Sequence, residues 1–424
     1  MKYLSYKTKK SQINIDEIFI EDVAITDITK EIGSPFYCYS KKNLIENFLE
    51  FKHGIEEQNF LDYKICYAIK ANFNLHLIKI LASHGAGIDA VSAGEIFVAL
   101  EAGIDPKKIV FAGVGKTREE IIFALENGVE EFSVESESEM YLLNEIAIKL
   151  KRKAKFSLRV NPDVDAKTHH KISTGKKGDK FGVDIEQAIS LYQIAERLEG
   201  LEVYGIAMHI GSQIISIEPF SLAFKKMRDL FFDLRKLGIK IASLDFGGGI
   251  GILYKNEKTI LLSDYFKLIK EITKDLKVKI VIAPGRAIVG SAGVLVVKTL
   301  FIKPTSSKNF IVIDGAINDL MRPGLYGSYH EVLPVYKRQG AKRLFDFAGP
   351  VCESTDILAK ERYIVEPKKD DLFVFCSAGA YGSSMSSEYN FRQLIPEILV
   401  DGKDFKIIRK RPTYREMLKL YQID

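Results

Sequence analysis

The sequence has few cysteines and no long apolar run. Only four of its 424 residues are cysteines, Cys38, Cys66, Cys352 and Cys376, and none forms a CxxC pair. Such sparse cysteines argue against a disulfide framework and a zinc site, and they favour a reducing compartment. The N-terminus lacks the features of a signal peptide, and no segment approaches the roughly 20 apolar residues of a membrane-spanning helix. We therefore expect a cytoplasmic protein with no membrane partner and no metal.

The chain also lacks a strong excess of one charge. It carries 61 basic and 56 acidic residues, a formal net charge of +5 at pH 7, which gives little support to a nucleic-acid partner. Hydrophobic residues make up 46% and charged residues 28%, as is ordinary for a globular protein. Because 424 residues exceed one typical domain, we expect a large domain and a second one.

Short β-rich runs alternate with helical patterns between residues 64 and 285, which is typical of parallel βα units. Eight such runs occur, at 64–70, 86–91, 108–113, 131–135, 155–161, 203–210, 242–247 and 279–285. Helical periodicity marks the stretches 74–84, 93–102, 118–127, 136–150, 185–198 and 219–237. This pattern predicts an α/β fold, a (β/α)8 TIM barrel over residues 36–285. A doubly wound open sheet is the main alternative.

The sequence changes in character after about residue 286. Glycine and proline there interrupt β-rich segments, which lie at 292–303, 309–315, 346–354 and 371–382. Residues 15–25 are strand-like as well. We therefore expect residues 1–35 and 286–424 to form one β-rich domain, which is discontinuous in sequence and mostly C-terminal.

Polar or reactive residues stand at the C-terminal end of nearly every predicted barrel strand. They are Lys70, Asp89, Glu135, Arg159, Asn161, His209, the glycine turn 247–249 and Arg286. Barrel enzymes carry their active sites at this face. The pattern therefore favours an enzyme.

Lys70 closes an apolar strand, where its ammonium would point into the barrel mouth and lose water. Desolvation lowers the pKa of a lysine and favours the nucleophilic amine, which forms Schiff bases with carbonyl compounds. A lysine that simply extends to solvent explains the position equally well.

The glycine turn 247–249 and His209 are weaker signals. Consecutive glycines let backbone N–H groups approach a phosphate, although most such turns are merely tight, and this one matches neither the dinucleotide fingerprint nor a P-loop. Ser212, close behind His209, could add a hydroxyl. A lone histidine is usually structural, and only the neighbouring strand ends favour a role for this one.

Two further pairs lie in the expected β domain. Cys352 and Glu353 combine a potential proton donor with a carboxylate in a loop, although an inert buried thiol is the commoner case. Arg322 and Tyr326 could bind a carboxylate through a guanidinium and a phenol, or could simply pack within a loop.

Seven motifs follow one another along the chain. They are YAIKAN (67–72), HIGSQ (209–213), GGG (247–249), PGR (284–286), RPGLY (322–326), CES (352–354) and AYG (380–382). With them the sequence resembles, over essentially its full length, the diaminopimelate decarboxylase family. These are pyridoxal-phosphate-dependent enzymes of the alanine-racemase-like barrel class, which also includes ornithine and arginine decarboxylases. No single motif is specific for this family, whereas the seven motifs in this order are highly specific for it.

The resemblance implies pyridoxal 5′-phosphate as the cofactor and gives individual residues their roles. The catalytic residues would be Lys70, which holds the cofactor as a Schiff base, His209, which stacks on its ring, and Cys352, which, as an alternative to Lys70, would reprotonate the carbon that has lost CO₂. The other cofactor-binding residues would be Ser212, Gly248, Gly249, Gly285, Arg286 and Tyr381. The substrate-binding residues would be Arg286, Arg322, Tyr326, Glu353 and Tyr381.

The resemblance also implies a reaction and a partner. The substrate would be meso-2,6-diaminopimelate and the products L-lysine and CO₂, in the last step of lysine biosynthesis. Glu353 can pair with the distal ammonium of that substrate and Arg322 with its distal carboxylate, whereas ornithine decarboxylases have aspartate after the cysteine. In the family this loop enters the site of the other subunit, so we expect a homodimer with shared active sites.

Ala283 departs from the family pattern, in which a glutamate before Pro-Gly-Arg pairs with the pyridine nitrogen of the cofactor. An alanine cannot form that pair, so the ring should be a poorer electron sink. This leaves open a non-catalytic, cofactor-binding regulatory homologue. A racemase, or a decarboxylase of ornithine or arginine on the same barrel, is a further alternative.

Overall fold

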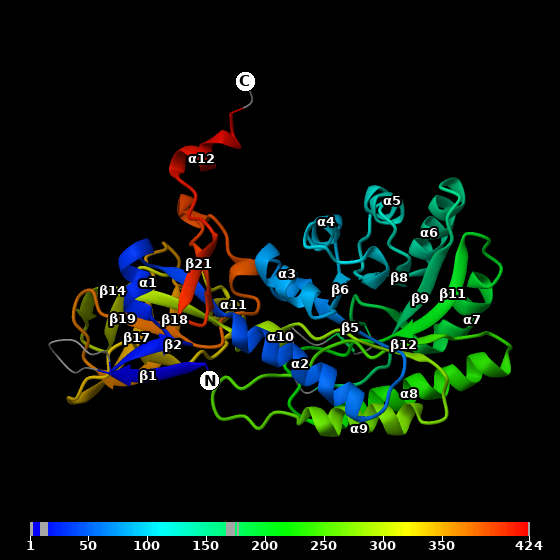
Figure 1. Cartoon of the computed structure of the whole chain (residues 1–424), viewed down its shortest axis with the longest axis horizontal. Helices are drawn as coiled ribbons and strands as arrows, with labels where there is room; N and C mark the ends of the chain where they lie inside the picture. Colours follow the sequence, from blue (N-terminus) through cyan, green and yellow to red (C-terminus); the bar gives the residue numbers. More distant parts are fainter. Residues whose placement is uncertain (1–2, 9–15, 167–173, 176–177, 423–424) are drawn as a thin grey trace. The chain divides into compact units, whose positions relative to one another are not determined.

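The computed structural model describes residues 3–8, 16–166, 174–175 and 178–422 (Figure 1). The chain forms two compact units. The barrel unit comprises Asn47–Ile252 and Lys258–Ile288. The β unit comprises Met1–Glu46, Leu253–Glu257 and Val289–Asp424.

Parallel strands form a closed ring in the barrel unit, in the order β9-β11-β12-β13-β5-β6-β7-β8, with β8 pairing with β9 to close it. The ring strands are β5 (Tyr63–Ala68), β6 (Gly87–Ala90), β7 (Ile109–Phe111), β8 (Glu131–Val134), β9 (Ala154–Asn161), β11 (Leu201–Ala207), β12 (Ser243–Asp245) and β13 (Lys279–Ile282). The short β10 (Val183–Asp184) pairs with β9 beside the ring. Each predicted run overlaps one ring strand. The predicted (β/α)8 barrel is confirmed, and the open-sheet alternative is wrong.

Helices lie around the outside of this ring (Figure 1). They are α2 (Lys41–Glu57), α3 (Leu75–Ser83), α4 (Ala93–Glu101), α5 (Arg118–Glu126), α6 (Glu137–Lys149), α7 (Ile185–Ala195), α8 (Ile217–Lys236) and α9 (Leu262–Thr273). The 3-10 turn η1 (Ile69–Ala71) follows β5, the 3-10 turn η2 (Pro106–Lys108) precedes β7, and the short α10 (Arg286–Val289) follows β13. Side-chain oxygens of Ser92, Thr117 and Ser136 accept first-turn N–H groups, which explains why α4, α5 and α6 begin within one residue of the predicted starts.

The β unit is built on a large mixed sheet, in the order β18-β17-β15-β14-β4-β20-β21, with β19 pairing with β14 and β16. Its strands are β4 (Phe36–Ser40), β14 (Gly293–Pro304), β15 (Asn309–Ile313), β16 (Val332–Pro334), β17 (Lys342–Ala348), β18 (Ile357–Val365), β19 (Leu372–Phe375), β20 (Glu397–Asp401) and β21 (Asp404–Arg409). The strand β4 pairs with β14 and β20, so residues 36–40 pack here and the ring strands begin later, at Tyr63.

The N-terminal segment packs into the same unit. A three-stranded sheet consists of β1 (Leu4–Thr8), β2 (Asp16–Ile20) and β3 (Val23–Ala24), followed by α1 (Ile25–Ile32). Ile18 and Ile28 share one buried apolar cluster with Val294, Val374 and Ile398. This shared core joins the two ends of the chain, and the predicted discontinuous β domain is confirmed. The remaining elements are α11 (Arg322–Tyr326), α12 (Tyr414–Lys419), η4 (Ser383–Met385) and η5 (Tyr389–Phe391).

Candidate active site

Lys70 lies in η1, directly after β5. Its Nζ is 3.2 Å from Oδ2 of Asp89, the next-to-last residue of β6. The side chain of Lys70 remains 37% exposed, whereas that of Asp89 is 13% exposed. The amine is therefore held by a carboxylate at the barrel mouth and is still open to a small molecule.

His209 follows β11 and is enclosed by the glycine turn 247–249. Its Nδ1 accepts a hydrogen bond of 3.2 Å from the N–H of Gly248. Desolvation, followed by the positive charges of Arg159 and Lys70, holds the pKa of His209 well below its usual value of 6.5. The imidazole is therefore neutral at physiological pH.

The glycine turn needs glycine at each position because neighbouring backbone lies so close. A Cβ at Gly248 would lie 2.1 Å from the carbonyl oxygen of Ala283. A Cβ at Gly249, where φ is +112°, would lie 2.5 Å from the carbonyl oxygen of Gly211. The turn is thus tightly packed between the segments that follow β11 and β13.

Arg286 begins α10 and is 6% exposed. Its Nε and Nη2 lie 3.3 Å and 3.1 Å from Oγ of Ser212, to which they donate. A Cβ at Gly285 would lie 3.1 Å from the carbonyl oxygen of Ala68, so this segment packs beside the end of β5. All the residues assigned to the barrel region thus lie at the carboxyl ends of the ring strands. They are Lys70, His209, Ser212, Gly248, Gly249, Gly285 and Arg286.

In the β unit, Arg322 is 5% exposed and begins α11. Its Nη1 lies 2.8 Å from Nε2 of His330, and its guanidinium stacks 4.6 Å from the ring centre of Tyr254. Nδ1 of His330 is 2.8 Å from the carbonyl oxygen of Cys376. A carbonyl only accepts, so Nδ1 carries the proton and Nε2 accepts from Arg322. Sequence reasoning missed His330, which no local pattern marks.

Cys352 and Glu353 lie in an exposed loop between β17 and β18. The buried thiol considered above is therefore wrong for Cys352. The carboxylate of Asp356 holds this loop, because Oδ2 accepts the N–H of Val351 at 2.8 Å and Oδ1 that of Ile317 at 2.6 Å. Burial raises the pKa of Asp356 above its usual value. Sequence reasoning also missed this anchor.

Tyr326 and Tyr381 come from two other segments of the β unit. Tyr326 ends α11, and a Cβ at Gly324 in that helix would lie 3.2 Å from the carbonyl oxygen of Thr355. The helix that carries Arg322 and Tyr326 therefore packs against the loop of Cys352 and Glu353. Tyr381 follows β19 and has a left-handed backbone conformation, with φ of +55°.

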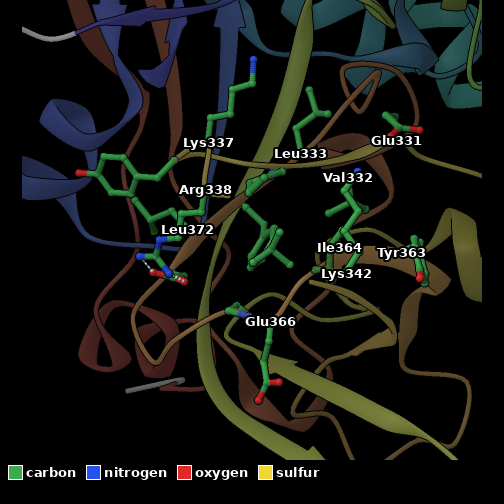
Figure 2. Close-up of a pocket in the computed structure, with 16 residues that line it drawn as sticks. Glu331, Val332, Leu333, Lys337, Arg338, Lys342, Tyr363, Ile364, Glu366 and Leu372 are labelled. Atoms are coloured by element: carbon green, nitrogen blue, oxygen red, sulfur yellow. Dashed lines mark hydrogen bonds and ion pairs between the residues drawn. The ribbon is translucent and has the colours of Figure 1, made fainter. Parts of the chain in front are cut away.

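The β unit also contains a separate cavity of about 390 Å³, shown in Figure 2. Leu333, Ile364 and Leu372 contribute to its apolar walls. Arg338, on its rim, forms an ion pair with Asp371. The lining contains none of the residues proposed for the site. Among the described residues no cluster of three or more potential metal ligands occurs, and no helix there is long and apolar enough to cross a membrane.

The donor set of the barrel mouth fits pyridoxal phosphate. Lys70 supplies an amine for the aldehyde, and His209 a neutral ring for the face of the pyridine. The buried guanidinium of Arg286 and the hydroxyl of Ser212 supply donors for the phosphate. Ala283, which is 9% exposed, offers no side-chain partner to the ring nitrogen.

Comparisons with known proteins agree with this fit. Residues 22–290 match the family model described as pyridoxal-dependent decarboxylase, pyridoxal binding domain. The diaminopimelate decarboxylase of Aquifex aeolicus is 45% identical over 399 residues, 94% of each chain. The crystal structure of the Helicobacter pylori diaminopimelate decarboxylase complexed with L-lysine is 38% identical, with a TM-score of 0.89 over 93% of this chain and 98% of that one. The M. jannaschii enzyme in co-complex with L-lysine is 33% identical, with a TM-score of 0.93 over 99% and 98%.

Proposed function

The chain belongs to the pyridoxal-dependent decarboxylases, and from this membership we propose that it converts meso-2,6-diaminopimelate to L-lysine and CO₂, the last step of lysine biosynthesis. The observation that carries the proposal is the barrel mouth, where a paired but accessible lysine stands with a neutral histidine and a buried arginine. Relatives similar over nearly the whole length carry this activity in their names, and two were solved with L-lysine.

The cofactor is pyridoxal 5′-phosphate. When bound, it supplies an electron sink for the bond between Cα and the leaving carboxylate. Lys70 would hold it through Nζ, and Asp89 would orient that amine while it is charged. The phosphate would be held by donors from several segments: Ser212, Gly248, Gly249, Gly285, Arg286 and Tyr381.

The groups of the β unit would recognise the substrate. Arg322, held by His330 and Tyr254, presents a guanidinium suited to a carboxylate. Glu353 would pair with the distal ammonium, while Arg286, Tyr326 and Tyr381 would complete the contacts. A diamino dicarboxylate is the class of substrate that needs both charges at its far end.

Cys352 would return a proton from Sγ to the substrate Cα after CO₂ has left, and Nζ of Lys70 is the other candidate donor. We further propose a homodimer in which Cys352 and Glu353 serve the site of the partner subunit. The exposure of both residues supports this arrangement. The unpaired state of all four cysteines supports a cytoplasmic location.

The test is product analysis with the purified protein and pyridoxal phosphate. We expect equal amounts of CO₂ and L-lysine from meso-diaminopimelate, and little turnover of ornithine or arginine. A preference for either of those amino acids would contradict the roles of Glu353 and Arg322. An absorbance of the bound cofactor without turnover of any amino acid would instead identify a non-catalytic homologue.

The Ala283→Glu variant is compared with the unaltered protein in the same assay. It restores a carboxylate for the ring nitrogen, so we expect a higher kcat than in the unaltered protein, with the same product. An unchanged kcat would mean that another group or a water already supports the ring nitrogen.

A further inference from the structure

We propose that the ion pair of Glu135 and Arg159 and the backbone N–H of Gly248 act together as a positioning device for His209. They hold its imidazole neutral, with the single ring proton on Nε2. The inference rests on the proposed function in one respect, because there His209 lies against the cofactor ring. Glu135 and Arg159 stand at strand ends but have no role in the reaction described above.

Glu135 and Arg159 form a buried ion pair. Nη1 of Arg159 lies 2.9 Å from Oε1 of Glu135, and the two side chains are 12% and 2% exposed. The same carboxylate accepts the N–H of Gly113 at 3.1 Å on Oε1 and that of Gly182 at 3.0 Å on Oε2. Three donors therefore hold the carboxylate of Glu135 in one orientation, and it in turn holds the guanidinium in place.

A second ion pair lies behind the first and fixes its backbone. The N–H of Glu135 donates to Oε2 of Glu139 at 2.9 Å, while Oε1 of Glu139 lies 2.6 Å from Nζ of Lys116. Lys116 also donates to the carbonyl oxygens of Gly113 and Ser133, at 2.8 Å and 2.7 Å. Every donor of this lysine is thus used, which makes the support of Glu135 rigid.

The tautomer of His209 follows from the hydrogen bond made by its ring. A backbone N–H can only donate, so Nδ1, 3.2 Å from N of Gly248, must be unprotonated. A neutral imidazole then carries its proton on Nε2. A Cβ at Gly247 would lie 3.1 Å from Nδ1 and 2.3 Å from the carbonyl oxygen of Met208. Glycine at this position lets the turn close against the ring of His209.

The charges around His209 oppose its protonation. Arg159 on β9 pairs with Ala207 on β11, two residues before His209. Arg159 and Lys70 on η1 both lower the pKa of His209, in addition to the larger effect of desolvation. Lys70 is paired with Asp89 on β6, and desolvation raises the pKa of the nearby, half-buried Asp245 on β12 to about 7. An imidazolium would add a third positive charge and lose the bond from Gly248. Arg159 therefore acts through His209, as a positioning residue.

The test is ¹⁵N NMR of the full-length protein with cofactor bound and histidine labelled, from pH 5.5 to 8.5, with His209→Gln used to assign the signals. We expect His209 to show an unprotonated Nδ1 and a protonated Nε2 throughout. Arg159→Gln should raise the pKa of His209 by roughly one unit or more, while Arg159→Lys keeps the charge and should restore the original behaviour. Arg118→Gln, which breaks an exposed pair with Glu145, is the control.

Removing one member of a buried ion pair can unfold a protein, so Glu135→Gln combined with Arg159→Gln provides a variant without an uncompensated charge. A proton on Nδ1 in the unaltered protein would overturn the inference. So would a pKa of His209 that neither Arg159→Gln nor the double variant changes. The spectra are recorded without substrate, so a failure of the proposed decarboxylation would leave this result intact.

Discussion

The barrel mouth and the loop of Cys352 and Glu353 in the β unit are constructed in opposite ways. At the barrel mouth the charged groups are paired or buried within their own unit, as with Lys70 on Asp89 and Arg286 on Ser212. Cys352 and Glu353 are exposed. Groups that are held in place within one unit suit a cofactor that stays bound. Exposed groups suit chemistry that needs the surface of a second protein subunit.

The hydrogen bonds of His209 and His330 show the same contrast between the two units. His209 accepts a backbone N–H on Nδ1, while His330 donates from Nδ1 to a backbone carbonyl. The two rings therefore present opposite groups at Nε2, a donor in His209 and an acceptor in His330. In each unit a hydrogen bond between one backbone group and Nδ1 sets the tautomer of the histidine ring. In the β unit the resulting acceptor at Nε2 orients Arg322.

Lys70→Ala should have the largest effect on turnover. We expect it to remove the absorbance of the bound cofactor and to lower kcat by on the order of 10⁴-fold or more, because it removes the amine that would hold the aldehyde. Absorbance spectra and lysine production measure both effects. Lys79→Ala, on the exposed face of α3, is the matched control and should change neither. Retention of the absorbance in Lys70→Ala would remove Lys70 from the site.

Cys352→Ala should come next, and it separates the two regions. We expect kcat to fall by about 10² to 10⁴-fold through loss of a proton donor, with cofactor absorbance and thermal stability unchanged because the residue is exposed. Ser354→Ala, two residues along the same exposed loop, is the control. A loss of cofactor from Cys352→Ala would contradict the division of roles between the units.

Mixing the Lys70→Ala and Cys352→Ala proteins tests whether the exposed loop of Cys352 serves the active site of a partner subunit. Random exchange makes half of the dimers mixed, and each mixed dimer has one intact site, so about one quarter of the original activity should return. Size-exclusion chromatography follows the dimer, and lysine production the recovery. Exchange without recovery would place Cys352 in the site of its own subunit.

Asp356→Asn should have a smaller effect. The amide group can accept only one of the two N–H groups that the carboxylate holds, from Val351 and Ile317, and its NH₂ group faces the other. We expect a loss of about 1 to 3 kcal/mol in the free energy of unfolding and roughly tenfold lower kcat/KM, since the loop of Cys352 would shift. Thermal melts and steady-state kinetics measure these, with the exposed Asp404→Asn as control. Unchanged kinetics would mean that the loop does not need this anchor.

The sequence predicted the features that rest on local pattern. The ring strands are short β-rich runs, and several helices begin at a capping side chain such as Ser92 or Thr117. The helix α9 was missed, and its N-cap, Leu261, provides no side-chain acceptor. Positions at strand ends and in loops marked most of the candidate site residues, and the family resemblance supplied their proposed roles, which await the experiments above.

The supports of the site escaped prediction because they are contacts between distant residues. His330 bonds the carbonyl of Cys376, 46 residues away, and Asp356 bonds the N–H of Ile317, 39 residues away. Neither contact leaves a periodicity or spacing in the sequence. Arg159 and Glu135 lie at the ends of the paired strands β8 and β9, but the ion pair between their side chains has no periodicity or spacing that marks it in the sequence.

Asp245→Asn should have the smallest effect on turnover. It tests whether the carboxyl group of Asp245 is protonated in the folded barrel unit. Burial raises the pKa of Asp245 from 3.8 to about 7, so between these values the folded protein holds a proton that the unfolded chain has released. The resulting stabilisation is full below about pH 4 and is lost as the pH rises towards 7.

The asparagine variant cannot titrate, and its side-chain oxygen can still accept the N–H of Gly247. Relative to the variant, the unaltered protein should therefore lose up to about 4 kcal/mol of unfolding free energy between pH 4 and pH 8. Urea unfolding across that range measures the difference, with the exposed Asp233→Asn as control. Parallel stability curves would mean that Asp245 is ionised in the folded barrel, and the charges around His209 would then include one more carboxylate.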